Sequence, residues 1–249
     1  MTYDYLASTN EYYSTVQLAS PQYSEPYPNP EEAERFGAIG LYLSMVRFEI
    51  KPRERVPRIL DLGCGRGWLT NLMSPFGECL GIEPSSGAVA LATSLFPHLN
   101  FTAGTLNELL DSPSFSPFDV VVSSEVIEHV PDNYKSSFIG DIRRSLAPDG
   151  YCIITTPRGE LYRKWHKNNG WHQPIEEWLT ENELRSAFEE AGFVPLHHTR
   201  VHKIPFLVSS RVNQNTRFGR VMDAFGLRFL PSAFDYVSSF YQVWLFKIR

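Results

Sequence analysis

Short apolar runs alternate with helical patterns along most of the chain. Runs of consecutive apolar residues predict strands at 59–62, 79–83, 100–103, 120–123, 151–156, 194–201 and 241–248. Apolar residues that recur every three or four positions predict helices at 31–48, 67–73, 85–95, 134–146 and 180–191. This alternation favours an α/β fold with a mostly parallel sheet and helices on both faces. Such sheets bind ligands at the carboxyl ends of their strands.

Helix end signals support two of these assignments. Pro52 ends the first helix, since proline cannot continue it. In the last helix Thr180 and Glu183 have the spacing of a capping box, and Gly192 is suited to the position after its end.

We divide the chain into an N-terminal aromatic cap and helix (1–57), a ligand-binding core (58–201), an insertion (202–240) and a last core strand (241–249). Seven of the 12 tyrosines lie in the first 42 positions. Residues 202–240 are rich in basic and aromatic residues and are far longer than an ordinary connection between strands. We expect this insertion to form a lid on the substrate side.

Composition narrows the class of protein. Among 249 residues, 23 are Lys or Arg and 28 are Asp or Glu, which gives a net charge of −5. This balance argues against non-specific nucleic-acid binding, which needs many phosphate-neutralising cations. Cys64, Cys79 and Cys152 are too few and too scattered for a disulfide framework or a zinc site. No run reaches the roughly 18 apolar residues that span a bilayer, so we expect a cytoplasmic protein without a transmembrane segment.

A glycine-rich turn, 63–67, joins the first predicted strand of the core to a helix. Glycines let the chain turn sharply and let a ligand approach backbone amides at the start of a helix. Glu83 ends the next strand, where a carboxylate can accept both hydroxyls of a ribose. A nicotinamide oxidoreductase would need a glycine at Trp68, so that class is not favoured. A tight turn without a ligand is the alternative.

Several segments resemble the class I S-adenosylmethionine-dependent methyltransferases. Residues 59–67 are similar to the first motif of that family, 104–106 to its adenine loop, 118–124 to its fourth strand and 146–151 to the turn into its fifth. The resemblance covers about 58–193. It implies a Rossmann-like seven-stranded sheet, S-adenosylmethionine as methyl donor and S-adenosylhomocysteine as product.

The resemblance also implies a set of cofactor-binding residues: Asp61, Gly63, Cys64, Gly65, Glu83, Pro84, Thr105, Leu106, Ser124 and Glu125. One position departs from the family pattern, because many members carry an aspartate where this chain has Thr105. We therefore expect backbone amides and the side chain of Leu106 to contact the adenine.

The segment after the fourth strand, 124–130, is similar to that of ubiquinone-biosynthesis O-methyltransferases. In that family the E-x-x-E-H pattern is associated with a divalent cation, which implies Glu125, Glu128 and His129 as Mg²⁺ ligands. We expect no metal, because similar segments occur in methyltransferases without one. We predict instead that His129 is a general base, since imidazole titrates near neutral pH. His172, in a later loop, is a second acid–base candidate. A purely structural role is the alternative for both histidines.

The expected acceptor is a small molecule. Arg158, Arg163, Lys164 and Lys167 follow the fifth strand, and with the basic insertion they favour an acceptor that carries carboxylate or phosphate. A solvated surface is the alternative. The aromatic residues among these charges also suggest contact with a membrane surface or a carrier protein.

We expect methyl transfer to a small-molecule acceptor, with oxygen favoured by the resemblance to ubiquinone-biosynthesis enzymes. Two alternatives stay open: an N-methyltransferase of a small amine or amino acid, and a catalytically silent cofactor-binding partner protein. A nucleic-acid methyltransferase is not favoured, because the chain lacks a basic track and has Ser-Ser-Glu at 123–125.

We also predict that residues 1–30 close over the bound cofactor.

Overall fold

The computed structural model describes residues 24–50, 56–166, 173–202 and 239–249, together with Tyr12; at 164–166 it describes the backbone alone. The strands are β1 (Arg58–Leu62), β2 (Glu78–Glu83), β3 (Asn100–Ala103), β4 (Phe118–Ser124), β5 (Leu146–Pro157), β6 (Phe193–Val201) and β7 (Tyr241–Ile248). The helices are α3 (Pro30–Ile50), α4 (Trp68–Met73), α5 (Ser86–Leu95), α6 (Leu106–Leu110), α7 (Asp132–Ser145), α8 (Gly159–His166) and α9 (Glu181–Glu190), with short 3₁₀ helices η2 (Ser74–Phe76) and η3 (Ile127–His129).

The strands form one seven-stranded sheet in the order β3-β2-β1-β4-β5-β7-β6. Strands β1 to β5 pair in parallel, whereas β7 runs antiparallel to both β5 and β6. The order reverses at β1 and β4, where the chain crosses from one half of the sheet to the other. The carboxyl ends of these two strands therefore meet beside each other, which is the place where open sheets bind ligands.

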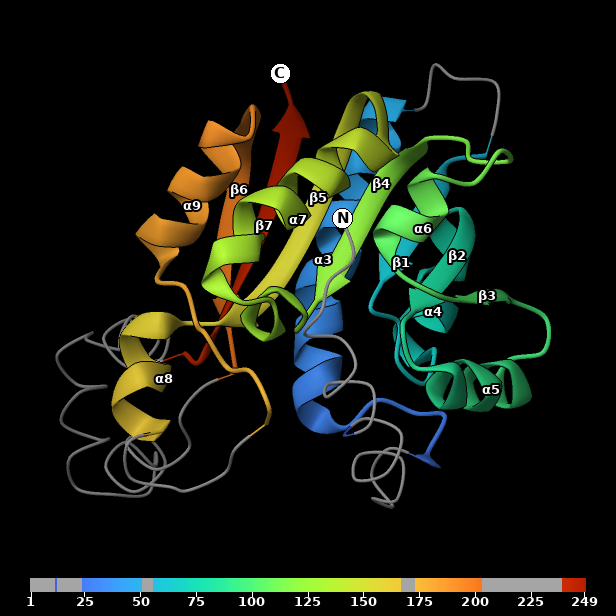
Figure 1. Ribbon diagram of the computed structural model, residues 1–249, viewed down its shortest axis with the longest axis horizontal. Coiled ribbons are helices and arrows are strands. Elements are labelled where there is room, and N and C mark those ends of the chain that lie inside the picture. The colour runs from blue at the N-terminus through green and yellow to red at the C-terminus, as the bar shows by residue number, and fades with distance from the viewer. Residues whose placement is uncertain (1–11, 13–23, 51–55, 167–172, 203–238) are drawn as a thin grey trace, which may run out of the picture.

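Helices cover both faces of the sheet, as Figure 1 shows. The buried apolar residues of α3 and α4 pack on one face, and those of α6, α7 and α9 pack on the other. Val120, Val121 and Val122 of β4 are all at most 1% exposed, because a central parallel strand is covered on both sides.

The fold class predicted from the sequence is confirmed. All seven predicted strands form, and the capping box of Thr180 and Glu183 begins α9 as expected. The largest boundary error lies between α7 and β5: α7 ends at Ser145 and β5 begins at Leu146, five residues before the predicted strand. Leu146 pairs with Phe118, and the register shifts before Val120, so the predicted helix end is an irregular start of the strand.

The sequence analysis missed α6 and α8, which are short. The proposed division of the chain stays a prediction, because much of its cap and almost all of its insertion lie outside the described residues.

Candidate active site

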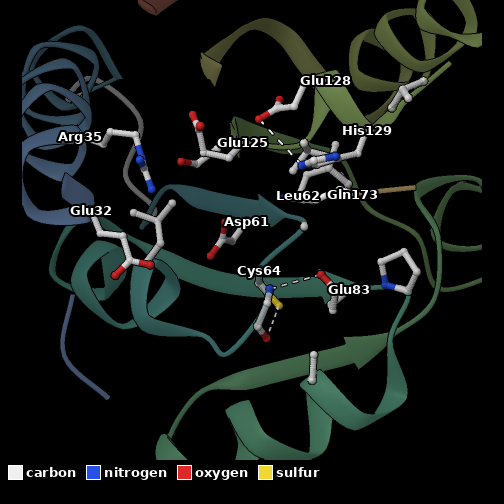
Figure 2. Close-up of a pocket in the computed structure, with 18 of the residues that line it drawn as sticks. Glu32, Arg35, Asp61, Leu62, Cys64, Glu83, Glu125, Glu128, His129 and Gln173 are labelled. Carbon is white, nitrogen blue, oxygen red and sulfur yellow. Dashed lines mark hydrogen bonds and ion pairs between the residues drawn. The ribbon is translucent and has the colours of Figure 1, made fainter. Parts of the chain in front are cut away.

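A cavity of about 440 Å³ opens at the carboxyl ends of β1, β2 and β4. All ten residues predicted to bind the cofactor line it, as do His129 and residues of α3 and of the loop after α8. The structure thus brings together side chains that are up to 64 positions apart in the sequence, from Asp61 to Glu125. Figure 2 shows Asp61 between Glu83 on one side and Glu125 and Glu128 on the other.

The glycine turn forms one wall of the cavity. Gly63, Gly65 and Gly67 have φ angles of +79°, +51° and +81°, a region that side chains disfavour. A Cβ at Gly63 would lie 2.4 Å from Cγ2 of Val126, so this glycine is needed for packing. A Cβ at Gly65 would meet no atom within 4 Å. The backbone at Gly65 is therefore open to a ligand.

Glu83 at the end of β2 is held against this turn. Its Oε2 accepts a hydrogen bond from the Gly65 amide at 3.2 Å, and its Oε1 accepts one from the Ser85 amide at 3.0 Å. Burial raises the pKa of Glu83, and these two amide bonds oppose that effect. Each oxygen has a further lone pair, so the carboxylate can still accept hydroxyl groups of a sugar.

Two other predicted cofactor contacts have structural partners. Asp61 accepts a hydrogen bond from the Thr70 hydroxyl at 2.5 Å, and burial raises its pKa to about 7. Thr105 is the N-cap of α6, where its hydroxyl accepts from the Glu108 amide at 3.2 Å. The Thr105 hydroxyl is thus engaged in the cap, and the buried Leu106 offers an apolar contact beside it.

Glu125 and Glu128 form the opposite wall. Thr155 donates to Oε1 of Glu125 at 2.8 Å, and Thr156 donates to Oε2 of Glu128 at 3.0 Å, so neighbouring residues of β5 hold the two carboxyl groups. Burial raises the pKa of Glu125 to about 8 and that of Glu128 to about 7.

His129 has the geometry of a neutral base. Its Nδ1 lies 2.8 Å from the carbonyl oxygen of Ile175, which can only accept, so Nδ1 carries the hydrogen and Nε2 is the unprotonated nitrogen. Nε2 lies 4.0 Å from Oε1 of Glu128. Burial lowers the pKa of His129, which keeps the ring neutral near pH 7. The other candidate, His172, lies outside the described residues.

Whether Glu125, Glu128 and His129 hold magnesium stays a hypothesis from the resemblance. Within the described ranges, His, Cys, Asp and Glu side chains form no group of three that could hold a metal ion.

Two of the basic residues expected to face the acceptor are held in ion pairs. Arg158 is 6% exposed, and its Nε lies 3.0 Å from Glu181. Arg163 pairs with Glu183 at 2.9 Å on the surface. The side chains of Lys164 and Lys167 lie outside the described part of the chain. These four positions therefore supply no unpaired cation that the structure describes.

The sequence analysis missed a different cation, Arg35. This residue lies on the buried face of α3 and lines the cavity, with its guanidinium 4.8 Å above the ring of Tyr241. Its Nη1 donates to Glu31 at 3.2 Å. The only sequence signal is an arginine one helical turn after a glutamate on an otherwise apolar face.

Arg66 in the glycine turn was also missed. Its Nη1 and Nη2 bond the two carboxylate oxygens of Glu32 at 2.8 and 2.7 Å, and its Nε donates to the carbonyl of Glu25 at 2.9 Å. The pair is buried, so it fixes the start of α3 and the segment before it against the turn.

Known proteins of two kinds resemble this chain in sequence. The ubiquinone biosynthesis O-methyltransferase of Azorhizobium caulinodans is 34% identical over 153 residues, which cover 55% of this chain and 58% of the relative. The chloroplastic tocopherol O-methyltransferase of Arabidopsis thaliana is 32% identical over 153 residues, which cover 57% of this chain and 40% of the relative. The chain thus matches 40% to 58% of the length of these relatives.

Solved structures share the fold at low sequence identity. Magnesium protoporphyrin IX methyltransferase of Synechocystis PCC 6803, with bound S-adenosylhomocysteine, has a TM-score of 0.61 at 12% identity over 98% of this chain and 100% of that chain. A SAM-dependent methyltransferase of Archaeoglobus fulgidus has a TM-score of 0.59 at 17% identity over 84% of this chain and 93% of that chain.

In the part of the chain that the structure describes, none of the helices is long and apolar enough to cross a membrane.

A family model also matches this chain. The family described as "Methyltransferase domain" matches residues 34–198. This range contains the glycine turn, Glu83, Glu125, Glu128 and His129. The resemblance predicted from the sequence is confirmed, and the chain belongs to the methyltransferase domain family.

Proposed function

We propose that this protein transfers a methyl group from S-adenosylmethionine to an oxygen atom of a small-molecule acceptor. One observation carries the proposal: all ten predicted cofactor contacts line one cavity that also contains a neutral, oriented histidine. The two relatives named above are O-methyltransferases of small molecules, which supports oxygen over nitrogen.

The cavity fits the proposed donor. Gly65 leaves open space beside its backbone, and Glu83 is a fixed carboxylate at the end of β2 for the ribose hydroxyls. When bound, S-adenosylmethionine supplies a methyl group on a sulfonium, whose departure leaves a neutral thioether. The protein therefore needs no acid for the leaving group, and its main task is to align acceptor and donor, an effect worth up to roughly 7–11 kcal/mol.

His129 is suited to take the acceptor's proton. As the acceptor oxygen bonds to the methyl carbon, its O–H bond breaks and the proton moves to Nε2 of His129, the unprotonated ring nitrogen. The carbonyl of Ile175 fixes the ring, and Glu128 stabilises the imidazolium that forms. A base is needed here because the surrounding carboxylates disfavour an ionised hydroxyl in the cavity.

Finer features of the acceptor remain part of this proposal. A carboxylate or phosphate on the acceptor is supported only by the basic residues of the sequence, and Arg158 and Arg163 are already paired. Contact with a membrane surface or a carrier protein rests on the aromatic residues of the insertion. A cytoplasmic location is likewise a prediction from the sequence.

Calorimetry tests the cofactor. We expect S-adenosylmethionine and S-adenosylhomocysteine to bind and NAD not to bind, whereas binding of NAD alone would reject the proposal. Glu83→Ala should weaken cofactor binding by about 1.5–3 kcal/mol, since the ribose hydroxyls lose a charged acceptor.

A second experiment identifies the acceptor. The protein is incubated with isotope-labelled donor and separate sets of phenols, carboxylates, sugars and amines, and products are read by mass spectrometry. Methylated oxygen supports the proposal, and methylation of amines alone favours the N-methyltransferase alternative. Donor binding without any transfer favours the silent cofactor-binding protein.

A further inference from the structure

The two carboxyl groups of Glu125 and Glu128 lie where the reacting end of the donor is expected. Figure 2 shows them across Asp61 from Glu83. A donor whose ribose lies at Glu83, and which extends past Asp61, brings its sulfur toward these carboxyl groups. The cavity is also lined by Tyr162, Trp178 and Tyr241, and we place the acceptor beside these aromatic residues.

Glu125 is held in a conformation that its residue type disfavours. Its φ angle is +60°, in the left-handed region that is costly for residues with a side chain. Such a conformation persists only where the surroundings enforce it, and these positions cluster at functional sites. Thr155 in turn fixes Oε1 of Glu125 at 2.8 Å. The backbone and β5 thus aim this carboxyl group into the cavity.

An unsatisfied buried donor shares the same space. The side chain of Arg35 is 10% exposed, and within the described residues its Nε has no hydrogen-bond partner. Figure 2 shows the guanidinium directed into the cavity toward Glu125. A buried donor without a partner is costly, so it points to a ligand that completes this region.

The local field is negative despite Arg35. Burial raises the pKa of Tyr162 to about 12, and among the carboxylates Glu125 contributes most in the same direction. Glu31, Glu125, Glu128 and Glu176 all line this part of the cavity. A positive charge bound here is therefore favoured over a neutral atom in the same position.

We infer that Glu125 and Glu128 distinguish the charged methyl donor from its neutral product. This inference rests on the proposed function. The carboxylates attract the sulfonium of S-adenosylmethionine, and that attraction ends when the methyl leaves and the sulfur becomes neutral. The proton released by the acceptor moves to His129, whose Nε2 is 4.0 Å from Glu128. The positive charge therefore stays near Glu125 and Glu128, whereas the neutral sulfur of the product is no longer attracted to them. Release of S-adenosylhomocysteine is thereby favoured.

Calorimetry with three probes tests the inference. The probes are S-adenosylmethionine, S-adenosylhomocysteine and sinefungin, in which a protonated amine replaces the methylsulfonium. Measurements are made at about pH 8.5, where both carboxyl groups ionise readily. The wild-type protein should bind the two cationic probes at least about tenfold more tightly than the neutral product, a comparison that needs no variant.

Glu125→Gln and Glu128→Gln keep the shape of the side chains and remove the charge. Each should weaken binding of both cationic probes by about tenfold and change binding of S-adenosylhomocysteine by less than about threefold. Glu190→Gln removes an exposed charge of α9 that does not line the cavity, and it should preserve the ratio. Glu83→Gln should weaken all three probes alike, because they share the ribose.

Three results would overturn the inference. They are equal wild-type affinities for cationic and neutral probes, equal losses for all probes in Glu125→Gln and Glu128→Gln, and an equal change of ratio in Glu190→Gln. If the wild-type protein binds none of the probes, the proposed function itself fails, so the two failures are distinguishable.

Discussion

At the scale of single residues, His129 combines three properties that a general base needs. Its ring is oriented by the carbonyl of Ile175, its Nε2 lies beside Glu128, and burial lowers its pKa. A base with a lowered pKa is already unprotonated at neutral pH, and it takes up a proton only as the pH falls. Turnover should therefore rise with pH through the pKa of His129, which lies below 6.5, and then level off.

His129→Ala should lower kcat by about 10²–10⁴-fold, the usual contribution of a positioned base, with unchanged affinity for S-adenosylhomocysteine. His197→Ala is the matched control, because His197 is exposed on β6 and does not line the cavity. Steady-state kinetics and calorimetry measure the two effects. Unchanged turnover in His129→Ala would remove the base from the mechanism, and loss of activity on adding chelator would restore the magnesium hypothesis.

The proposed cofactor contacts were easier to predict than the residues on the proposed acceptor side. Gly63, Gly65 and Glu83 lie at strand ends with a fixed spacing, so local sequence reveals them. Arg35 and Arg66 gave no such signal, because their roles depend on contacts across the fold. Arg66 meets Glu32 from 34 positions away, and helical periodicity says nothing about such a partner.

At the scale of elements, α3 is fixed to the sheet by polar contacts as well as by its apolar face. Glu32 accepts both hydrogen bonds of the Arg66 guanidinium fork, and it also accepts from the Asn29 amide at 2.8 Å. Because α3 also carries Arg35, this buried pair sets the position of one cavity wall relative to the glycine turn.

Removal of one partner of this pair should be costly. Arg66→Met leaves the buried Glu32 carboxylate without its cation, and we expect the free energy of unfolding to fall by about 3–5 kcal/mol. Arg163→Met is the matched control, since its exposed pair with Glu183 should contribute only about 0–1 kcal/mol. Denaturant unfolding of both variants measures these two losses in the free energy of unfolding. Equal, small losses would mean that the buried pair does not hold α3.

Local sequence signals determine which helices and strands could be predicted. Long apolar strands and capped helices such as α9 were predicted to within a few residues, because burial and caps leave local signals. The five-residue α6 was missed, since Thr105 was assigned to the adenine loop and not to an N-cap. The start of β5 was misplaced because Pro148 and Gly150 are typical of a turn, whereas pairing across the sheet decides the strand.

At the scale of the whole molecule, the N-terminal region is expected to respond to the cofactor. Arg66 already connects the glycine turn to the carbonyl oxygens of Glu25 and Tyr27. Binding of S-adenosylhomocysteine at the turn should therefore increase protection from hydrogen exchange in peptides that cover 12–27. Peptides from α9, far along the sheet, are the internal control. Unchanged exchange at 12–27 would reject closure of this region over the cofactor.

The buried carboxyl groups also make the stability of the free protein depend on pH. Burial raises the pKa values of Asp61, Glu125 and Glu128 to about 7, 8 and 7. In the unfolded chain they ionise near pH 4, so between that pH and about 8 the folded state binds more protons. Their contribution to stability is full below the unfolded pKa, and it is lost as the pH rises through the folded values.

His129 and Glu181 also have shifted pKa values, but they affect the stability in other pH ranges. Burial lowers the pKa of His129, so its contribution is lost as the pH falls through about 6.5. Ion pairs and hydrogen bonds with His198, Arg200 and Arg158 lower the pKa of Glu181 to about 2 against the effect of burial, and its contribution is lost only in acid. Between about pH 6.5 and 8 the pH dependence therefore comes from the carboxyl groups whose pKa is raised by burial, Glu83 included.

Denaturant unfolding of the ligand-free protein should show a free energy of unfolding that falls across this window and levels off above about pH 8. Glu125→Gln and Glu128→Gln should each make the fall shallower, whereas Glu190→Gln, at the exposed end of α9, should leave it unchanged. Saturating S-adenosylmethionine should also reduce the fall, because its cation stabilises the ionised carboxylates that an empty cavity disfavours. A free energy that stays level across the window would show that these groups are already ionised in the folded protein at pH 6.5, which would contradict their raised pKa values.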